Sequence, residues 1–430
     1  MADDFLVLLL DGQTIGVIRR RQGRLSLIYD EAWRRRADAY PLSLSMPLTA
    51  AEHPHGPVNA FLWGLLPDNE VVIGRWARHF QVSPKSPFAL IEAVGEDCAG
   101  AVQFVRPDRL DALQGGAQDS VDWLDEREVA ERLKALREDQ SAWRAARDTG
   151  QFSLAGAQPK TALMWEDGRW GVPSGRLPTT HILKPPTAAF DGHAENEHLC
   201  LILARRLGIP AAASQVETFE GEIAIVVERY DRLRLSARIA RVHQEDFCQA
   251  LARLPSEKYQ NEAGPGVPDC VAVLADQSSA PGEDINTFLD AILFNWIVVG
   301  TDAHAKNYSL LLSSEGRVRL APLYDIASAL PYRALDYQKL KLAMKLGGEY
   351  RLRDIGARHI ARMAMEVRQN PRQWIERARD LAGRTPDEVM AIAGEMQAEG
   401  LKHEIVGRLA ELIAERARGL EALLAAWKPD

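Results

Sequence analysis

The sequence predicts an α+β protein in which a β-rich N-terminal part and a second β-rich segment precede a mainly helical C-terminal part. Three observations support this prediction. Residues 5–30 consist of three short apolar strands separated by the turn sequences DGQ and RQGR. Residues 161–174 contain two apolar segments joined by Asp-Gly, a dipeptide typical of β-hairpins. Beyond residue 236, long apolar and amphipathic stretches with helical spacing dominate the chain.

The composition is that of an ordinary globular protein rather than of a general nucleic-acid binder. Apolar residues make up 46% of the 430 positions, which is enough for two or three domains with a substantial core. The chain carries 52 basic and 60 acidic residues, a net charge of −8. Its surface as a whole is therefore not expected to attract the phosphates of DNA or RNA.

The cysteines and the apolar runs indicate a cytoplasmic protein. None of the four cysteines has the spacing of a CxxC motif or of a zinc site; they are Cys98, Cys200, Cys248 and Cys270. We expect them to be small buried hydrophobic residues in a reducing compartment. The acidic start MADDFLVLLLDG does not fit a signal peptide. No run approaches the roughly 20 apolar residues of a membrane helix, so we expect no contact with a membrane.

Changes of pattern along the chain predict four segments. Residues 1–110 form an N-terminal β-rich subdomain, and residues 111–149 form a charged connection with an exposed helix. Residues 150–235 contain two strands, a third strand that ends at Lys184, a helix and two further strands. This order is the plan of a kinase small lobe. Residues 236–430 would then form a helical large lobe, so the fold class is protein-kinase-like and two-lobed.

The predicted large lobe contains several helical patterns. Residues 241–254, RVHQEDFCQALARL, are expected to be a helix after a polar start. Residues 285–300, INTFLDAILFNWIVVG, form an apolar segment long enough for a buried helix. The stretch from about residue 352 to residue 430 is amphipathic. It packs onto the large lobe or presents a face to a partner, and its periodicity favours neither alternative.

A cluster of polar residues, GTDAHAKNYS, follows the buried helix and precedes an apolar hairpin. Asp302 precedes Asn307 by five positions, which is the spacing of the base and the metal ligand in the kinase catalytic loop H-R-D-x-x-x-x-N. Asp325, in PLYDIAS, occupies the place of the metal-binding Asp that follows the hairpin in kinases. We therefore predict that Asp302 is the catalytic base, that Asn307 and Asp325 bind metal, and that Lys184 binds nucleotide phosphates.

Each of these residues also has a purely structural interpretation. Asp302 could cap a helix or turn, and Asn307 could occupy a left-handed turn. Asp325 could stabilise its loop, and Lys184 could be the solvated end of a strand. Each structural role alone would be the more common one. The four residues in kinase order, each on the expected element, favour the catalytic interpretation.

Four other residues carry weaker signals of a role in the site. His304 is expected to stabilise its own loop rather than to act as an acid, a base or a ligand, and Lys306 contacts a phosphate or only lies near one. Glu195 or Glu197 could pair with Lys184 as the Glu of a kinase helix C does. The alternative is that they are exposed residues of a first helical turn, where a carboxylate interacts favourably with the helix dipole.

At these residues the sequence resembles the HipA-like toxin kinases. The motifs that carry the resemblance occur in the family's order: LSLSMPL, GLLPDN, VGEDCAGAVQF, SLAGAQPKTAL, THILKPP, ENEHLC, VVERYDR, HQEDFCQAL, TDAHAKNYS and PLYDIAS. They span almost the whole chain, and together they are highly specific. The resemblance implies an ATP- and Mg²⁺-dependent serine/threonine-protein kinase that acts as the toxin of a toxin–antitoxin pair.

The resemblance also implies partners. Members of this family phosphorylate housekeeping proteins such as an aminoacyl-tRNA synthetase, and a small helix-turn-helix antitoxin of the HipB type neutralises them. Contact with operator DNA would come mainly through that antitoxin, which agrees with the acidic balance of this chain.

The motif SLAGAQPK would be the phosphate-binding loop, and its Ser153 corresponds to the serine that these kinases autophosphorylate to inactivate themselves. Gly156 is the only glycine of this loop, so the loop departs from the G-x-G-x-x-G of other protein kinases and could be only a tight turn. It can still present backbone N–H groups to a phosphate. The residues implied in ATP binding are Ser153, Leu154, Ala155, Gly156, Ala157, Gln158, Lys160, Lys184, Glu228, Tyr230, His304 and Lys306.

Two other functions stay open on the sequence alone. A kinase with the same lobe plan could phosphorylate a small molecule, and a chain that keeps the fold without turnover could serve as a co-repressor subunit. The N-terminal β-rich subdomain favours the protein kinase, because a small-molecule kinase has no obvious need for it.

Overall fold

The computed structural model describes residues 4–116, 119–139, 153, 155–156, 158–187, 190–236 and 238–427. The chain forms two compact units, each built from several stretches of sequence. Unit 1 comprises Met1–Pro185, Glu217–Pro255 and Ser309–Val318. Unit 2 comprises Pro186–Val216, Ser256–Tyr308 and Arg319–Asp430.

Unit 1 begins with a five-stranded antiparallel sheet in the order β4-β3-β2-β1-β5. Its strands are β1 (Asp4–Leu10), β2 (Gln13–Arg21), β3 (Arg24–Tyr29), β4 (Glu52–His53) and β5 (Val102–Val105). The turn between β1 and β2 has positive φ at Asp11 and Gly12, 45° and 83°, as expected for an Asp-Gly hairpin. The three predicted N-terminal strands are thus confirmed.

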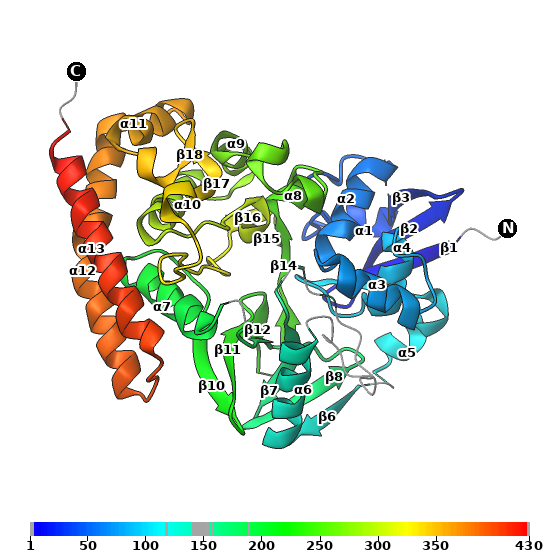
Figure 1. Ribbon diagram of the computed structural model, residues 1–430. Coiled ribbons are helices and arrows are strands. Elements are labelled where there is room, and N and C mark those ends of the chain that lie inside the picture. The colour runs from blue at the N-terminus through cyan, green and yellow to red at the C-terminus, as the bar shows by residue number, and fades with distance from the viewer. Residues whose placement is uncertain are drawn as a thin grey trace. The chain divides into compact units, whose positions relative to one another are not determined.

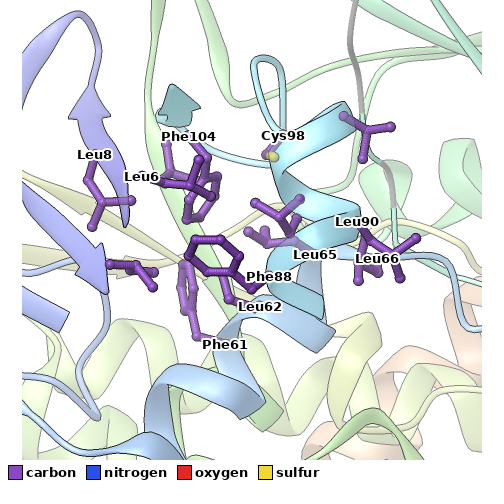
Figure 2. Close-up of a cluster of buried hydrophobic side chains, with 14 of the residues drawn as sticks. Leu6, Leu8, Phe61, Leu62, Leu65, Leu66, Phe88, Leu90, Cys98 and Phe104 are labelled. Atoms are coloured by element: carbon purple, nitrogen blue, oxygen red, sulfur yellow. The ribbon is translucent and has the colours of Figure 1, made fainter. Parts of the chain in front are cut away.

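Short helices cover this sheet and bury most of its apolar residues. They are α1 (Glu31–Arg34), α2 (His55–Leu65), α3 (Glu70–His79), α4 (Pro87–Val94), the 3₁₀ turn η1 (Pro107–Arg109) and α5 (Leu110–Gln114). Figure 2 shows Phe61 and Leu62 of α2 packed against Phe88 of α4, beside Leu6 of β1 and Phe104 of β5. Each such fully buried side chain stabilises the fold by roughly 1.5–3 kcal/mol.

A second sheet has the order β10-β11-β9-β7-β8-β6. Its strands are β6 (Ser120–Leu124), β7 (Thr161–Glu166), β8 (Arg169–Ser174), β9 (His181–Lys184), β10 (Ser214–Phe219) and β11 (Glu222–Glu228). Five of them follow the predicted small-lobe order. The sixth, β6, comes from the segment expected to be a charged connection, and it pairs with β8.

Helix α6 (Glu126–Glu138) follows β6 and begins with a capping box between Asp125 and Glu128. The sequence predicted this helix correctly, but the helix is exposed on one face only. Val129 and Leu133 are fully buried and belong to the core that covers the second sheet. The apolar residues at this spacing form a buried stripe that the many charges of the segment conceal in the sequence.

A buried network of ion pairs connects the end of β11 to the loop after α4. Arg229 and Asp231 form an ion pair of 2.8 Å, and Arg232 reaches Asp97 at 2.8 Å. Burial alone would raise the pKa of Asp97, but attraction by three neighbouring arginines outweighs it and holds that pKa well below its usual range. The strands β12 (Arg232–Arg234) and β13 (Ile239–Arg241) continue this region as a two-stranded ribbon.

The last sheet connected with unit 1 has the order β14-β15-β16, with β14 (His243–Asp246), β15 (Ser309–Ser313) and β16 (Arg317–Leu320). Helix α8 (Phe247–Ala250) follows β14 directly. The single helix predicted for residues 241–254 is therefore wrong in its first half. The backbone of β14 pairs with β15, a partner more than 60 residues further along the chain, and local helical periodicity gives no sign of this pairing.

Unit 2 is mainly helical and contains the predicted buried helix. Its helices are α7 (His193–Arg206), α9 (Val267–Gln277), α10 (Pro281–Val298), α11 (Ala357–Glu366), α12 (Pro371–Ala398) and α13 (Glu404–Ala425). Single turns of 3₁₀ helix and one hairpin complete it: η2 (Pro255–Glu257), η3 (Gln260–Glu262), η4 (Ala305–Asn307), η5 (Tyr337–Lys339), η6 (Leu352–Asp354), β17 (Lys341–Leu346) and β18 (Glu349–Arg351).

The C-terminal stretch packs within unit 2, which agrees with the first of its two alternatives, packing onto the large lobe. Figure 1 shows α12 and α13, in orange and red, as long helices side by side. Helix α13 buries Ile405, Leu409 and Ile413 at helical spacing. Within the part of the chain that the structure describes, no helix has the length and apolar character that a membrane crossing requires.

Candidate active site

The predicted catalytic loop begins where the buried helix α10 ends. Val299 caps this helix in the left-handed conformation with a φ of 61°, and Gly300 follows it. A Cβ atom at Gly300 would lie 2.1 Å from Oδ1 of Asn295, so a larger residue here would require the Asn295 side chain to move. The chain then turns through Asp302 into η4 and continues as β15. The tight exit from α10 thus places the polar residues of the loop.

Asp302 is exposed, and its carboxylate is oriented by a tyrosine. The hydroxyl of Tyr259 donates a hydrogen bond of 2.5 Å to Oδ1 of Asp302. The backbone N–H of His304 donates to the backbone oxygen of Asp302 at 2.8 Å, which closes the turn. A carboxylate held at a defined position and open to solvent can accept a proton from an incoming hydroxyl group.

Tyr259 is a residue of this site that the sequence analysis missed. Its ring meets the ring of His304 edge to face, with 4.9 Å between the ring centroids. The backbone oxygen of the preceding Lys258 accepts a hydrogen bond of 3.3 Å from Ala305 of η4. Tyr259 lies 43 positions before Asp302, in a segment without regular periodicity. No local sequence signal connects the two residues.

Asn307 and Asp325 meet as the predicted metal ligands should. Nδ2 of Asn307 donates to Oδ2 of Asp325 at 3.4 Å, across 18 positions of sequence. The Oδ1 atom of Asn307 is buried and accepts no hydrogen bond from the described residues. Asp325 itself adopts a positive φ of 58°, an uncommon backbone conformation for a residue with a side chain. A buried amide oxygen beside a carboxylate suits a hard cation.

These two residues fit a magnesium ion of the kinase type. Among the described residues, no group of three or more His, Cys, Asp or Glu side chains could hold a metal ion by itself. A kinase site needs no such group, because Mg²⁺ takes one or two protein oxygens together with phosphate oxygens and water. Oδ1 of Asn307 and the carboxylate of Asp325 are the groups that would hold it.

The two basic residues of the loop are both buried. His304 is packed against Tyr259, and its predicted role in its own loop stays a prediction. Lys306 lies within η4, and its backbone oxygen accepts a hydrogen bond of 2.7 Å from the hydroxyl of Tyr324. Because Tyr324 directly precedes Asp325, this bond ties the segment of the second metal residue to the catalytic loop.

Unit 1 contains the residues predicted to bind nucleotide phosphates. Lys184 is the last residue of β9; it is buried and pairs with Ile225 of β11. Nζ of Lys160 donates a hydrogen bond of 2.7 Å to the backbone oxygen of Ala155. Gly156 has a φ of 105°, and a Cβ atom there would lie 2.6 Å from Nζ of Lys160. The one glycine of the loop therefore permits a close approach of a buried ammonium group.

The other described positions of the predicted phosphate loop differ in burial. Gln158 is half-buried, whereas Leu154 and Ala157 lie outside the described residues. Ser153 is completely buried. Its hydroxyl donates to the backbone oxygen of Leu65 at 2.8 Å, and its N–H donates to the backbone oxygen of Asp97 at 2.9 Å.

Residues 226–232, VVERYDR, combine exposed and deeply buried side chains. Glu228 ends β11 and is exposed, whereas Tyr230 is half-buried and donates its hydroxyl hydrogen to Oε1 of Gln244. Between and beside these residues, Arg229 and Asp231 belong to the buried ion network. Half of this motif is thus structural, which a sequence motif by itself does not distinguish.

The structure of helix α7 bears on the two alternatives for Glu195 and Glu197. Glu195 and Glu197 are buried, with 3% and 0% of their surface exposed. The alternative of exposed residues in a first helical turn is therefore wrong. A pair between either glutamate and Lys184 stays a prediction.

The elements described so far define a class of protein. A buried helix leads into a loop with Asp302 and Asn307, a hairpin leads on to Asp325, and a separate sheet bears Lys184; this is the organisation of a protein-kinase-like enzyme.

Comparison with known proteins identifies the family. Residues 6–105 match the model of the HipA N-terminal domain, and residues 152–400 match the model of the HipA-like C-terminal domain. The chain therefore belongs to the HipA family of kinases. The expected kinase-like α+β fold with a β-rich N-terminal part is also confirmed. A solved structure of the Shewanella oneidensis HipA, HipB and operator DNA complex matches with a TM-score of 0.82 and 25% identity, over 98% of each chain.

Two relatives align over most of their length. The putative kinase Y4mE of Sinorhizobium fredii is 37% identical over 350 residues, which cover 81% of this chain and 82% of the relative. The serine/threonine-protein kinase toxin HipA of Shewanella oneidensis is 30% identical over 347 residues, which cover 77% of this chain and 76% of the relative.

Proposed function

We propose that this protein is an ATP- and Mg²⁺-dependent serine/threonine-protein kinase that acts as the toxin of a toxin–antitoxin pair. The arrangement of Asn307 and Asp325 supports this function most strongly. The two side chains are 3.4 Å apart although 18 positions separate them, and the buried Oδ1 of Asn307 accepts no hydrogen bond from the described residues. Asp302 lies exposed on the same loop. The family membership agrees with this assignment.

Each residue of the catalytic loop has a defined role in the proposed reaction. Asp302 accepts the proton of a serine or threonine hydroxyl group while the oxygen of that group bonds to the γ-phosphorus. The bond between the γ-phosphorus and the β–γ bridging oxygen breaks, and ADP leaves with its electron pair. Asn307 and Asp325 would hold Mg²⁺, whose positive charge would stabilise the phosphate oxygens.

The residues that we assign to the nucleotide lie in unit 1 and on the catalytic loop of unit 2. We assign Lys184, Lys160 and the backbone of residues 153–158 to the phosphates, because buried ammonium groups and turn N–H groups bind phosphate oxygens well. Glu228 and Tyr230 are assigned to the adenine side. Lys306 and His304 lie on the loop of Asp302 and complete the proposed site.

Autophosphorylation of Ser153 would inactivate the enzyme. Because Ser153 is completely buried and its hydroxyl donates to Leu65, the loop has to leave this position before a phosphate can be attached. In a phosphoserine the Oγ atom carries no hydrogen, so it cannot donate to the backbone oxygen of Leu65. Its charge of about −1.5 to −2 would also repel the phosphates of ATP.

The proposed partners follow from the family. The Shewanella oneidensis relative forms a complex with HipB and operator DNA. By analogy, we propose a helix-turn-helix antitoxin for this chain, contact with operator DNA mainly through that antitoxin, and a cytoplasmic protein substrate such as an aminoacyl-tRNA synthetase. We retain the predicted segments 1–110, 111–149, 150–235 and 236–430 as the functional division of the chain.

Expression in a bacterial host tests the proposed function. Wild type should arrest growth, Asp302→Asn at equal protein level should not, and co-expression of the neighbouring antitoxin should restore growth. Equal arrest by the two forms would contradict the proposal. Consumption of ATP that depends on an added metabolite, without any phosphoprotein, would identify a small-molecule kinase instead. A chain that does neither, even without the antitoxin, would be a co-repressor subunit.

A further inference from the structure

Helix α7 holds the backbone of the segment that follows Asp325 through one buried side chain. Nδ2 of Asn196 donates a hydrogen bond of 2.8 Å to the backbone oxygen of Ser328, and the backbone N–H of Ser328 donates to Oδ1 of Asn196, also at 2.8 Å. Asn196 and Ser328 are 0% and 1% exposed. A side-chain amide thus pairs with both polar groups of one residue's backbone, as a neighbouring strand would.

The same helix and the segment after it hold both sides of Asp325. Ser328 lies three residues after Asp325. On the other side, Leu323 donates its N–H to the backbone oxygen of Pro210 and accepts from the N–H of Ala212, each at 2.8 Å. Pro210 and Ala212 lie four and six residues after the end of α7. The turn between these two attachment points contains Asp325 with its φ of 58°.

Such a backbone conformation persists only where the surroundings fix it. Residues with a side chain populate the left-handed region sparsely, although Asp tolerates it better than most. If one attachment point is lost, the segment can relax towards the common regions of φ and ψ. The carboxylate of Asp325 would then move relative to Oδ1 of Asn307.

We propose that Asn196 is a positioning residue that fixes Asp325 in its metal-binding conformation. The inference rests on the proposed metal-binding role of Asp325. It assigns a function to Asn196 that differs from the predicted roles of Glu195 and Glu197 on the same helix. Helix α7 thereby sets the geometry of the metal site through the backbone of Ser328.

An amide suits this position because it offers a donor and an acceptor side by side. Asn196→Asp keeps the acceptor for the Ser328 N–H but places a carboxylate oxygen against the Ser328 carbonyl oxygen. Asn196→Leu keeps the approximate volume and removes both hydrogen bonds to Ser328, along with those to Tyr332 and Cys200, which leaves the two buried backbone groups of Ser328 unpaired. The two variants should therefore form a graded series, with Leu the more severe.

Hydrogen exchange gives a test that does not depend on catalysis. In the full-length protein, the amides of residues 323–329 should exchange about tenfold faster in Asn196→Leu than in wild type, with a smaller increase in Asn196→Asp. The peptides of α12 and α13 should be unchanged. Thr385→Val is the matched control, because it removes another buried hydrogen bond of unit 2, from Oγ1 of Thr385 to the oxygen of Leu381. It should leave residues 323–329 as in wild type.

The dependence on Mg²⁺ separates positioning from simple destabilisation. At saturating ATP, Asn196→Leu should need about tenfold more Mg²⁺ for half-maximal phosphorylation, and Mg²⁺-dependent binding of a non-hydrolysable ATP analogue should weaken by a similar factor. Thr385→Val should change neither. If exchange at residues 323–329 and the Mg²⁺ requirement both match wild type, Asn196 has no positioning role.

The two proposals can fail separately. A wild-type protein that binds the analogue with Mg²⁺ but transfers no phosphate would contradict the proposed function. The exchange and binding measurements would still decide the role of Asn196. Faster exchange without any change in Mg²⁺-dependent binding would overturn the inference and leave Asn196 as a structural residue.

Discussion

Tyr259 contacts Asp302, the proposed catalytic base. The tyrosine hydroxyl donates to Oδ1 of Asp302 at 2.5 Å, and the tyrosine ring packs against His304. The contact holds the carboxylate in one orientation before a substrate arrives. Orientation of this kind contributes to the rate because the base must lie within hydrogen-bond reach of the attacking hydroxyl.

Tyr259→Phe should therefore lower kcat for phosphorylation by about tenfold while KM for ATP stays within about twofold of wild type. The ring and its contact with His304 are retained, so the thermal midpoint should change little. Tyr350→Phe, in β18, is the control and should behave as wild type. Steady-state kinetics with a protein that the kinase phosphorylates measures both parameters. A Tyr259→Phe enzyme with unchanged kcat would show that Asp302 needs no such support.

Single residues of the candidate site differ in how well the sequence predicted them. Asp302, Asn307 and Asp325 follow from spacing, because the catalytic loop and the hairpin after it are short and local. The structure brings Asn307 and Asp325 into contact, although their roles stay predictions. Tyr259 reaches the site only through tertiary packing, and no local sequence signal indicates it. Asn196 and Ser328 lie in the motifs ENEHLC and PLYDIAS, but neither motif indicates that the two residues are hydrogen-bonded.

Strand β14 makes buried contacts with the N-terminal part of unit 1. Oε2 of Glu245 accepts a hydrogen bond of 2.6 Å from Ser43, and Oε1 accepts one of 2.7 Å from the N–H of Leu44. Both partners belong to the motif LSLSMPL of the N-terminal part. Burial, only partly offset by these bonds, raises the pKa of Glu245 to about 8. The folded protein thus takes up a proton here at neutral pH.

This shift has a defined sign for stability. Between a pKa of about 4.3 in the unfolded chain and about 8 in the folded one, the folded state binds more protons than the unfolded state. The free energy of unfolding should therefore fall as the pH rises through this window, by at most about 1.4 kcal/mol per pH unit from this group. Glu245→Gln should flatten that dependence. Its free energy of unfolding, relative to that of wild type, should therefore be higher at pH 8 than at pH 5.

Denaturant unfolding at several pH values measures this effect, with the exposed Glu411→Gln of α13 as the control. The control should keep the wild-type pH profile. A Glu245→Gln profile parallel to that of wild type between pH 5 and 8 would show that Glu245 does not titrate in this range.

The predicted elements succeeded where periodicity is local and failed where pairing is distant. The N-terminal strands, the hairpin at Asp167 and the buried helix α10 have strong local patterns, and all three are confirmed. Strand β14 was predicted as part of a helix because its pairing partner β15 lies more than 60 residues away. Strand β6 was missed because the many charges around it conceal a short sheet edge.

Across the whole molecule, polar side chains as well as apolar packing connect distant parts of the sequence. In unit 1, Asp97 of the N-terminal part contacts Arg232 and Arg241, more than 130 positions further along. Removal of one partner would leave buried guanidinium groups without compensation, which typically costs about 3–5 kcal/mol. The N-terminal part is therefore integral to unit 1, and the backbone oxygen of the same Asp97 holds Ser153. These contacts explain physically why its motifs accompany the kinase motifs.

Incubation of the purified protein with ATP and Mg²⁺, followed by mass spectrometry of its peptides, tests the proposed kinase most directly. Asp302→Asn serves as the matched control, since it should still bind ATP but lose the group that accepts the proton. We expect phosphate on Ser153 in wild type and at least about a hundredfold less in Asp302→Asn. Equal phosphorylation of the two proteins, or no phosphate on a wild-type protein that binds ATP, would contradict the proposed catalytic loop.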